Sequence, residues 1–191
     1  MPKQVDYESR RRRIAEAVCL LADEHGPAGV SMRDVAVRAE VSLGAVQRCF
    51  RSKDEMLLFA VEHVGARVTE RVRARLAASP DRAAATALGH AADEIALLRP
   101  EHRAEARIWL AFVAQAAVSE ALARPLRDSY AALQDLLARL VAEADGRLDA
   151  QAEARTLLAL ADGLTSHVLL GHLTGREAEE VLRRHLAGLW R

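Results

Sequence analysis

Several residue types are scarce in this chain, and each scarcity excludes a class of protein. Only two of the 191 residues are cysteines, Cys19 and Cys49, which are too few for a disulfide scaffold and lack metal-ligand spacing. The three Phe, two Trp and two Tyr are too few to build a stacking platform for single-stranded nucleic acid. We therefore expect a reduced protein that holds no metal and no cofactor.

Long apolar runs are also lacking. A membrane-spanning helix needs about 18–20 apolar residues. The longest stretches without a charged residue, which begin at Ile108 and Gly163, are far shorter. The N-terminus is polar, and no apolar segment follows the arginine run Arg10–Arg13, so the sequence shows no signal peptide. These absences predict a cytoplasmic protein without a membrane partner.

Helix-breaking residues are few, with 10 Gly and 5 Pro in the whole chain. No segment alternates strictly between apolar and polar residues, whereas apolar residues recur at spacings of three and four throughout. The sequence therefore predicts an all-α protein. We expect about nine helices: Glu8 to His25, Ser31 to Ala39, Ser42 to Cys49, Lys53 to Ala78, Asp81 to the residue before Pro100, one around Ile108–Val113, one after a break at Arg124–Pro125, Asp149 to His172, and Thr174 to Trp190. Ser52 with Glu55, and Thr174 with Glu177, have the spacing of capping boxes.

The charges balance, with 27 Lys and Arg against 27 Asp and Glu. The first 53 residues carry a small basic surplus, which is concentrated in the run Arg10–Arg13. Such a run can follow or enter a DNA groove. The alternative is that it forms a solvated helix start, and the sequence alone leaves both interpretations open.

The most informative segment runs from Ser31 to Phe50. Two short helices, each preceded by a serine suited to N-capping, are joined by a turn at Glu40–Val41. This arrangement is the sequence form of a helix-turn-helix. Its inner face is expected to contain Val35, Ala36, Ala39, Val46 and Phe50.

The other side chains of these two helices are expected on the outer face. The second helix has small residues near its start, so that its backbone can enter a major groove, where Gln bonds adenine and Arg bonds guanine. Helix starts also offer N–H groups to phosphates. The predicted DNA-binding residues are Ser31, Arg33, Ser42, Leu43, Ala45, Gln47, Arg48 and Lys53. The alternative is a plain helical hairpin.

A family resemblance favours the first interpretation. It rests on Ile14–Ala17 with Leu21, Gly26, Ser31–Ala36, Val41–Gly44, Phe50 and Ser52–Leu57. In these residues and their spacing, about residues 9–60 resemble the N-terminal domain of TetR-family transcriptional repressors. The resemblance implies a helix-turn-helix DNA-binding domain over residues 1–54 and a helical effector-binding and dimerisation domain over residues 55–191.

Three residues depart from the family pattern. Glu40 stands where the turn usually has Gly, and a left-handed residue other than Gly costs about 1–2 kcal/mol. Gln47 replaces the usual aromatic residue of the recognition helix, and Cys49 replaces a frequent His or Tyr. These departures concern the turn and the DNA contacts.

The resemblance further implies a homodimer that forms through the last two helices and binds a pseudo-palindromic double-stranded DNA operator. The eighth helix suits burial on two sides, because apolar residues surround most of it. These residues are Leu157, Leu158, Leu160, Ala161, Leu164, Val168 and Leu169. A monomer with an unusually large core is the competing explanation.

The resemblance also implies an unknown small-molecule effector held among the fourth to eighth helices. The candidate lining residues are mainly polar side chains on apolar faces: His63, Arg67, His90, Trp109, Phe112, Gln115, Asp162 and His167. Each is also explained as a core or interface residue with its own partners. Asp162 stands out, because a buried carboxylate needs a partner.

An enzyme is not expected. The seven His residues are scattered without metal-binding spacing, and there is no Gly-rich phosphate loop or nucleophile elbow. The adjacent carboxylates Asp93 and Glu94 are expected to diverge on a helix. The sequence predicts a ligand-responsive transcriptional regulator. The alternative is a helical adaptor that binds a protein partner through an apolar groove.

Overall fold

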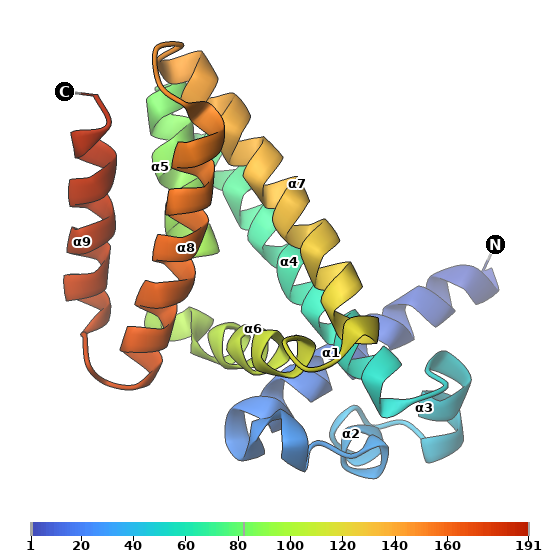
Figure 1. The fold of residues 1–191 in the computed structure, drawn as a ribbon. Coiled ribbons are helices and arrows are strands. Elements are labelled where there is room, and N and C mark those ends of the chain that lie inside the picture. Colours follow the sequence, from blue (N-terminus) through green and yellow to red (C-terminus); the bar gives the residue numbers. More distant parts are fainter. Residues whose placement is uncertain (1, 82, 191) are drawn as a thin grey trace. The chain divides into compact units, whose positions relative to one another are not determined.

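The computed structural model describes residues 2–81 and 83–190, and in these residues it contains nine α-helices, one short 3-10 turn and no strand (Figure 1). The prediction of an all-α fold is confirmed. The elements are α1 (Pro2–Gly29), α2 (Met32–Arg38), α3 (Leu43–Cys49), α4 (Lys53–Ala78), α5 (Ala84–Ile95), the 3-10 turn η1 (Pro100–His102), α6 (Arg103–Ala116), α7 (Glu120–Ala144), α8 (Ala150–Leu169) and α9 (Gly175–Gly188).

The helices form two compact units. The first contains residues 2–66 and 107–123, and the second contains the described residues of 67–106 and 124–190. The predicted boundary after residue 54 lies inside the first unit, which also includes the start of α4. None of the helices in residues 2–81 and 83–190 is both long enough and apolar enough to cross a membrane.

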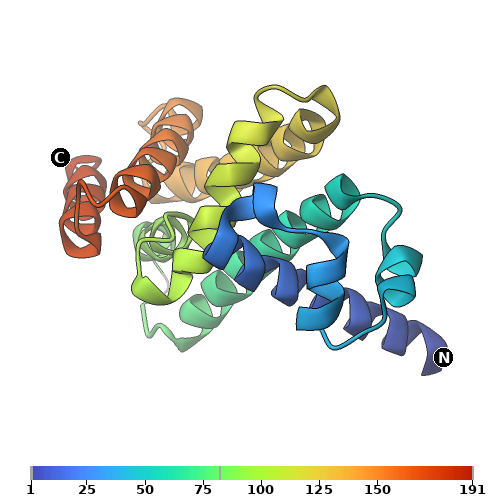
Figure 2. The same cartoon turned by 90° about the horizontal axis from the view of Figure 1, so that it is seen from below.

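In the first unit, α2 and α3 pack on each other and on α1, as Figures 1 and 2 show. One face of α1 is fully buried, with Ile14, Ala15 and Val18 at 0% exposure. Arg107 ties α6 to α1, because its Nη1 donates to the backbone oxygen of Asp23 at 2.7 Å. The helices α2 and α3 therefore pack on α1, whose inner face is fully buried.

In the second unit, α8 packs against α9, and α5 packs against both. Their shared core includes Leu88, Leu157 and Leu182, each no more than 2% exposed. α9 begins with a complete capping box: the Glu177 N–H donates to Thr174 Oγ1 at 3.2 Å, and the Glu177 carboxylate accepts from the Thr174 N–H at 2.8 Å. This box was predicted and is confirmed.

A buried ion cluster also lies in the second unit. Glu94 and Glu105 are 1% and 4% exposed, yet both are charged groups. Arg71 joins them, with Nε 2.7 Å from Glu94 and Nη2 2.8 Å from Glu105. Burial raises the pKa of Glu94, but the Arg71 hydrogen bond and neighbouring positive charges outweigh it, so the pKa lies below its ordinary value.

Arg75 corrects one expectation about this cluster. Asp93 and Glu94 were expected to diverge, but Arg75 lies 3.2 Å from a carboxylate oxygen of each. A guanidinium presents a fork of several donors, so two neighbouring carboxylates can share it. These carboxylates are therefore structural.

Several helix ends differ from the prediction. The first helix begins before Glu8, at Pro2, and Gly26 interrupts it with φ 72° instead of closing it. The predicted break at Arg124–Pro125 is wrong, because α7 continues through Pro125. Past the first turn, a proline removes one backbone hydrogen bond and crowds the carbonyl four residues earlier, a cost that other packing must offset. Leu122 and Leu126 are both buried, so apolar packing continues across the proline.

The predicted capping box at Ser52 is only half formed. Ser52 Oγ accepts from the Glu55 N–H at 3.1 Å, as a box requires. The Glu55 carboxylate instead accepts from the Arg51 N–H at 2.7 Å, one residue earlier than in a box. The start of α4 is nevertheless the predicted one, Lys53.

Candidate nucleic-acid interface

Two serines fix the starts of α2 and α3. Ser31 Oγ accepts from the Asp34 N–H at 3.2 Å, and Ser42 Oγ accepts from the Ala45 N–H at 3.1 Å. Both serines have extended backbones, as N-cap residues do. Their hydroxyls are therefore engaged in capping. The other N–H groups of the first turns lie at the positive helix ends, where phosphates bind.

The predicted inner face is confirmed. Val35, Ala36, Ala39, Val46 and Phe50 are all buried, at 6% exposure or less. The Phe50 ring packs against Phe59 of α4 with a centroid distance of 5.4 Å. This packing holds the outer face of the pair in a fixed orientation on the first unit.

The outer face is smaller than predicted. Arg33, Ser42, Gln47 and Arg48 are exposed, and Ser31 and Leu43 are half-buried. Ala45, however, is buried at 7% exposure, because the third position of α3 faces the helices on which α3 packs. Ala45 is therefore corrected to an inner residue.

Arg48 and Gly44 are neighbours on α3. A Cβ added at Gly44 would lie 3.5 Å from Arg48 Nη1, so the guanidinium extends back along the helix toward its N-terminal end. That end is the part of a recognition helix that contacts base edges. The Arg48 head group therefore lies beside Gly44.

The turn between the helices keeps its shape without glycine. Glu40 has φ 54°, in the left-handed region. The Glu40 N–H donates to the Val37 oxygen at 3.1 Å, and the Val41 N–H donates to the Ala36 oxygen at 2.9 Å. These two bonds form a Schellman motif, in which this position is usually Gly.

Replacing Glu40 with glycine is expected to stabilise the protein by about 1 kcal/mol. The left-handed conformation costs a residue with a Cβ about 1–2 kcal/mol, and the greater freedom of glycine in the unfolded chain offsets part of that gain. Urea unfolding measures the change. Glu40→Ala serves as the control, because it removes the carboxylate but keeps the strain. An equal gain for both variants would contradict the strain explanation.

The run Arg10–Arg13 is neither wholly a groove binder nor wholly a solvated helix start. The Arg11 guanidinium carbon lies 4.0 Å from the Phe59 ring centroid and 5.0 Å from that of Phe50. Arg13 Nη2 donates to the Ala39 oxygen at 2.8 Å, beside the Glu40 turn. Arg11 and Arg13 thus brace the helix pair, whereas Arg12 keeps a largely exposed side chain.

Lys53 and Arg38 also have structural partners. Lys53 Nζ donates to the Ala28 oxygen at 2.8 Å, which secures the loop before α2. Arg38 forms a two-bond pair with Glu24 of α1, at 2.8 and 2.6 Å. The Arg38 hydrogen bond lowers the pKa of Glu24. Lys53 is half-buried, and its ammonium is already engaged in this hydrogen bond.

The eight candidate effector residues do not share one cavity. Phe112 and Gln115 line a cavity of only about 10 Å³ in the first unit, with Leu57 and Ile108 among its walls. His63 and Trp109 are half-buried in the same unit. A cavity of this size has room for a water molecule at most.

The other four candidates belong to the second unit. The Arg67 Nε lies 3.0 Å from Glu105, as part of the ion cluster. His90 lines a groove between α5 and α9, and Asp162 accepts a hydrogen bond from the Tyr130 hydroxyl. The exposed His167 ring lies 4.9 Å from the His172 ring. The partner expected for Asp162 is therefore Tyr130.

Another cavity of the second unit was not predicted from the sequence. Its volume is about 400 Å³, and its lining includes Arg99, Arg103 and Arg176. One local signal could have found two of them. Arg103 and Arg176 stand in the first turns of α6 and α9, where the helix dipole disfavours a positive charge.

Two family profiles match the sequence. Residues 14–60 match the profile of bacterial regulatory proteins of the tetR family. Residues 84–191 match the C-terminal domain of BetI-type transcriptional repressors. The helix pair described above thus lies inside the N-terminal match.

Comparison with individual proteins also finds transcriptional regulators. The HTH-type transcriptional regulator PksA of Bacillus subtilis is 34% identical over 174 residues, which cover 89% of this chain and 83% of PksA. The HTH-type transcriptional regulator BetI of Burkholderia mallei is 31% identical over 167 residues, covering 86% and 84%. A solved transcriptional regulator from Saccharomonospora viridis, in complex with choline, matches with a TM-score of 0.81 at 24% identity, covering 94% of this chain and 96% of that chain.

Proposed function

The chain belongs to the TetR family of bacterial transcriptional regulators, and from this premise we propose that it is a repressor which binds a pseudo-palindromic operator as a homodimer. A small-molecule effector releases it from the DNA. Residues 1–54 form the DNA-binding domain in this proposal, and residues 55–191 bind the effector and the second subunit. The family supplies the coarse function, a DNA-binding regulator.

One observation supports the DNA-binding part above all. The outer face of α2 and α3 exposes Arg33, Gln47 and Arg48, while every apolar residue predicted for the inner face is buried. Gln47 and Arg48 carry the head groups suited to adenine and guanine. Ser31, Ser42 and Leu43 lie at the helix starts, where backbone N–H groups meet phosphates, and Lys53 adds a positive charge.

The dimer part is supported by the outward face of α8. Leu157, Leu158 and Leu164 are buried within the second unit and are therefore not available to a partner. The exposed positions include the small or apolar Ala159, Gly163 and Leu170, the last 81% exposed, beside the polar Arg155, Thr156 and His167. Two copies joined through this face would form an isologous two-fold interface.

Effector release is the third part. The effector favours a dimer whose two recognition helices no longer match the spacing of the half-sites, which is a population shift. The S. viridis regulator in complex with choline supports a small-molecule site in a protein of this fold.

Selection of bound sequences from random duplex DNA tests the proposal. For the wild-type protein we expect a pseudo-palindrome with half-sites about one helical turn, roughly 34–36 Å, apart. A Cβ at Gly163 would meet nothing within 4 Å, so Gly163→Arg leaves the protomer intact while placing a charge on the proposed interface. This variant is expected to be monomeric by light scattering and to bind the selected site far more weakly.

Ala131→Arg, at an exposed position of α7, is the matched control and should bind as the wild type does. Without an enriched motif, and with binding that fades uniformly as salt rises, the repressor proposal fails. A stable complex with another protein would then favour the helical adaptor. A dimeric Gly163→Arg variant would overturn the α8 interface alone.

A further inference from the structure

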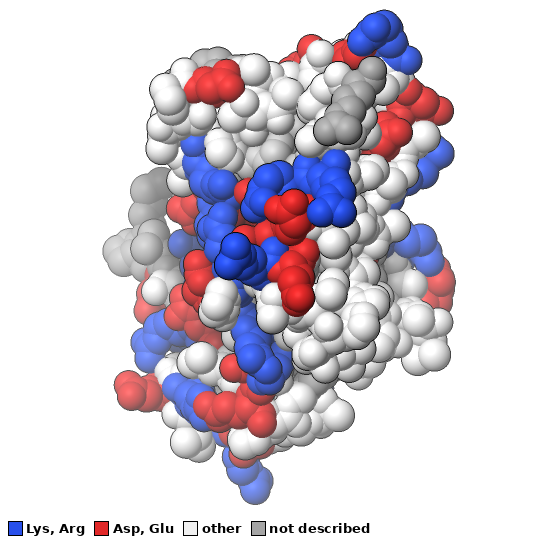
Figure 3. All heavy atoms as spheres, turned by 90° about the vertical axis from the view of Figure 1, so that its left-hand side faces the viewer, with Lys and Arg blue, Asp and Glu red and all other residues white. Residues whose placement is uncertain are grey.

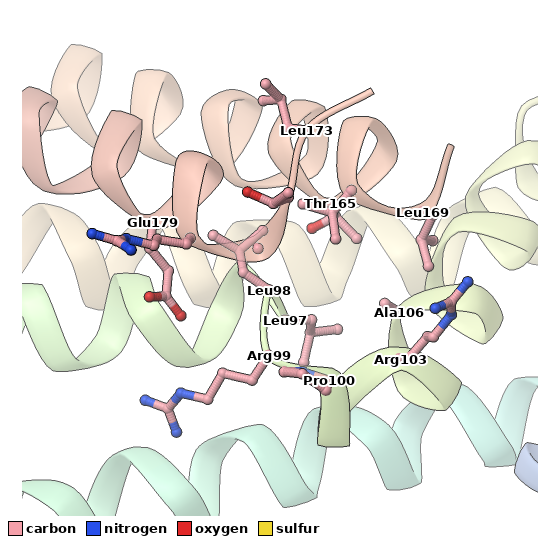
Figure 4. Close-up of a pocket in the computed structure, with 14 residues that line it drawn as sticks. Leu97, Leu98, Arg99, Pro100, Arg103, Ala106, Thr165, Leu169, Leu173 and Glu179 are labelled. Atoms are coloured by element: carbon pink, nitrogen blue, oxygen red, sulfur yellow. The ribbon is translucent and has the colours of Figure 1, made fainter. Parts of the chain in front are cut away.

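The second unit holds a preformed cavity of about 400 Å³ between the loop after α5 and the facing ends of α8 and α9. Its apolar wall includes Leu97, Leu98, Leu169 and Leu173. Figure 4 shows Leu97, Leu98 and Leu169 around the same space. A volume of this size falls within the range of small-molecule sites. The cavity can therefore take an apolar chain.

The wall is well defined. A Cβ added at Gly175 would lie 2.7 Å from the Leu98 oxygen, so the start of α9 rests directly on the loop after α5. The hydroxyl of Thr165, which also lines the cavity, is engaged with the Ala96 oxygen at 2.6 Å. Polar recognition must come from the charged residues at the rim.

Those charges favour an anion. The lining contains three arginines, Arg99, Arg103 and Arg176, against one carboxylate, Glu179. Arg99 is paired with Glu94 at 3.2 Å. Within the residues described, Arg103 and Arg176 have no ion-pair partner. Figure 3 shows basic and acidic side chains intermixed on the face that it presents.

Figure 4 separates the two ends of the cavity. Arg103 lies beside Ala106 and Leu169, whereas Glu179 and Arg99 lie at the opposite end. The head group of an anion is therefore expected at Arg103, away from the carboxylate. Arg103 also stands at the first position of α6, where the helix dipole favours a negative charge nearby.

We propose that this cavity binds a small amphiphile with one anionic head group, a carboxylate or a phosphate ester, held at Arg103 with its apolar chain along Leu97, Leu98 and Leu173. Arg176 adds to the positive potential of the rim. The cavity is lined by no aromatic residue among those described, so it lacks the cage that a quaternary ammonium ion such as choline requires. The role of this ligand as effector rests on the proposed function.

Isothermal calorimetry on the full-length protein tests the site without DNA. Sodium octanoate and octyl phosphate are the probes, and octan-1-ol and choline are the controls. We expect the anions to bind at least ten-fold more tightly than octanol, and choline not to bind. Shortening octanoate to hexanoate should weaken binding by roughly three- to four-fold per methylene group. The tighter of the two anions distinguishes a carboxylate ligand from a phosphate ester.

Arg103→Gln should weaken the binding of both anions about ten-fold, because a bidentate charged hydrogen bond is lost. Arg139→Gln, an exposed arginine of α7, is the matched control and should leave binding unchanged. Equal affinity for octanoate and octanol, or unchanged binding by a folded Arg103→Gln variant, would overturn the site.

Operator binding is then measured with and without octanoate. Loss of operator affinity in wild type but not in Arg103→Gln supports the effector role. Octanoate binding without any change at the operator overturns that role. Octanoate binding by a protein that selects no operator would show the proposed function, and not the site, to have failed.

Discussion

Replacing Arg71 with alanine is expected to lower the free energy of unfolding by about 1.5–3 kcal/mol, because two buried carboxylates each lose a charged hydrogen-bond partner while keeping at least one other arginine. Arg71 is the arginine that contacts both Glu94 and Glu105. Those carboxylates are 1% and 4% exposed, so water cannot replace the lost partner. Urea unfolding followed by circular dichroism, at fixed protein concentration, measures the loss.

The control is Arg73→Ala on the same helix. Arg73 is exposed and has no ion-pair partner among the residues that the structure describes, so its removal should change stability by less than about 0.5 kcal/mol. If Arg71→Ala lowered the free energy of unfolding by no more than Arg73→Ala does, the remaining arginines would satisfy both buried carboxylates, and Arg71 would not be needed for stability.

Gln47→Ala and Arg48→Ala are each expected to reduce affinity for the selected operator by roughly 1–3 kcal/mol, or about five- to 150-fold. Both side chains are exposed on α3, and Arg48 extends toward the end of the helix that meets base edges. Affinity for random DNA should change much less, because phosphate contacts supply most of it. A fluorescence titration on both duplexes separates the two effects.

Arg139→Ala, an exposed arginine outside the helix pair, should bind both duplexes as the wild type does. Equal losses on operator and random DNA would assign Gln47 or Arg48 to phosphate contact instead of base recognition. If neither variant lost affinity, α3 would not be the recognition helix.

The helix pair could be predicted from the sequence because its signals are local. Ser31 and Ser42 lie three residues from the N–H groups that they cap, and the inner-face residues follow helical spacing. The same holds for Thr174 with Glu177. The failures at Pro125 and Ala45 have a different cause, since packing against other helices outweighed the local preference.

The sequence by itself determined the all-helical fold, most helix starts, the inner face of the helix pair and, through family resemblance, the coarse function. Only the tertiary structure decided how the charged residues are used. Arg11 stacks on Phe59, and Arg71 neutralises Glu94, through segments far apart in the chain. The cavity beside Arg103 likewise combines three separate segments. Capping and periodicity act within a few residues, whereas burial and charge pairing depend on neighbours that only folding brings together.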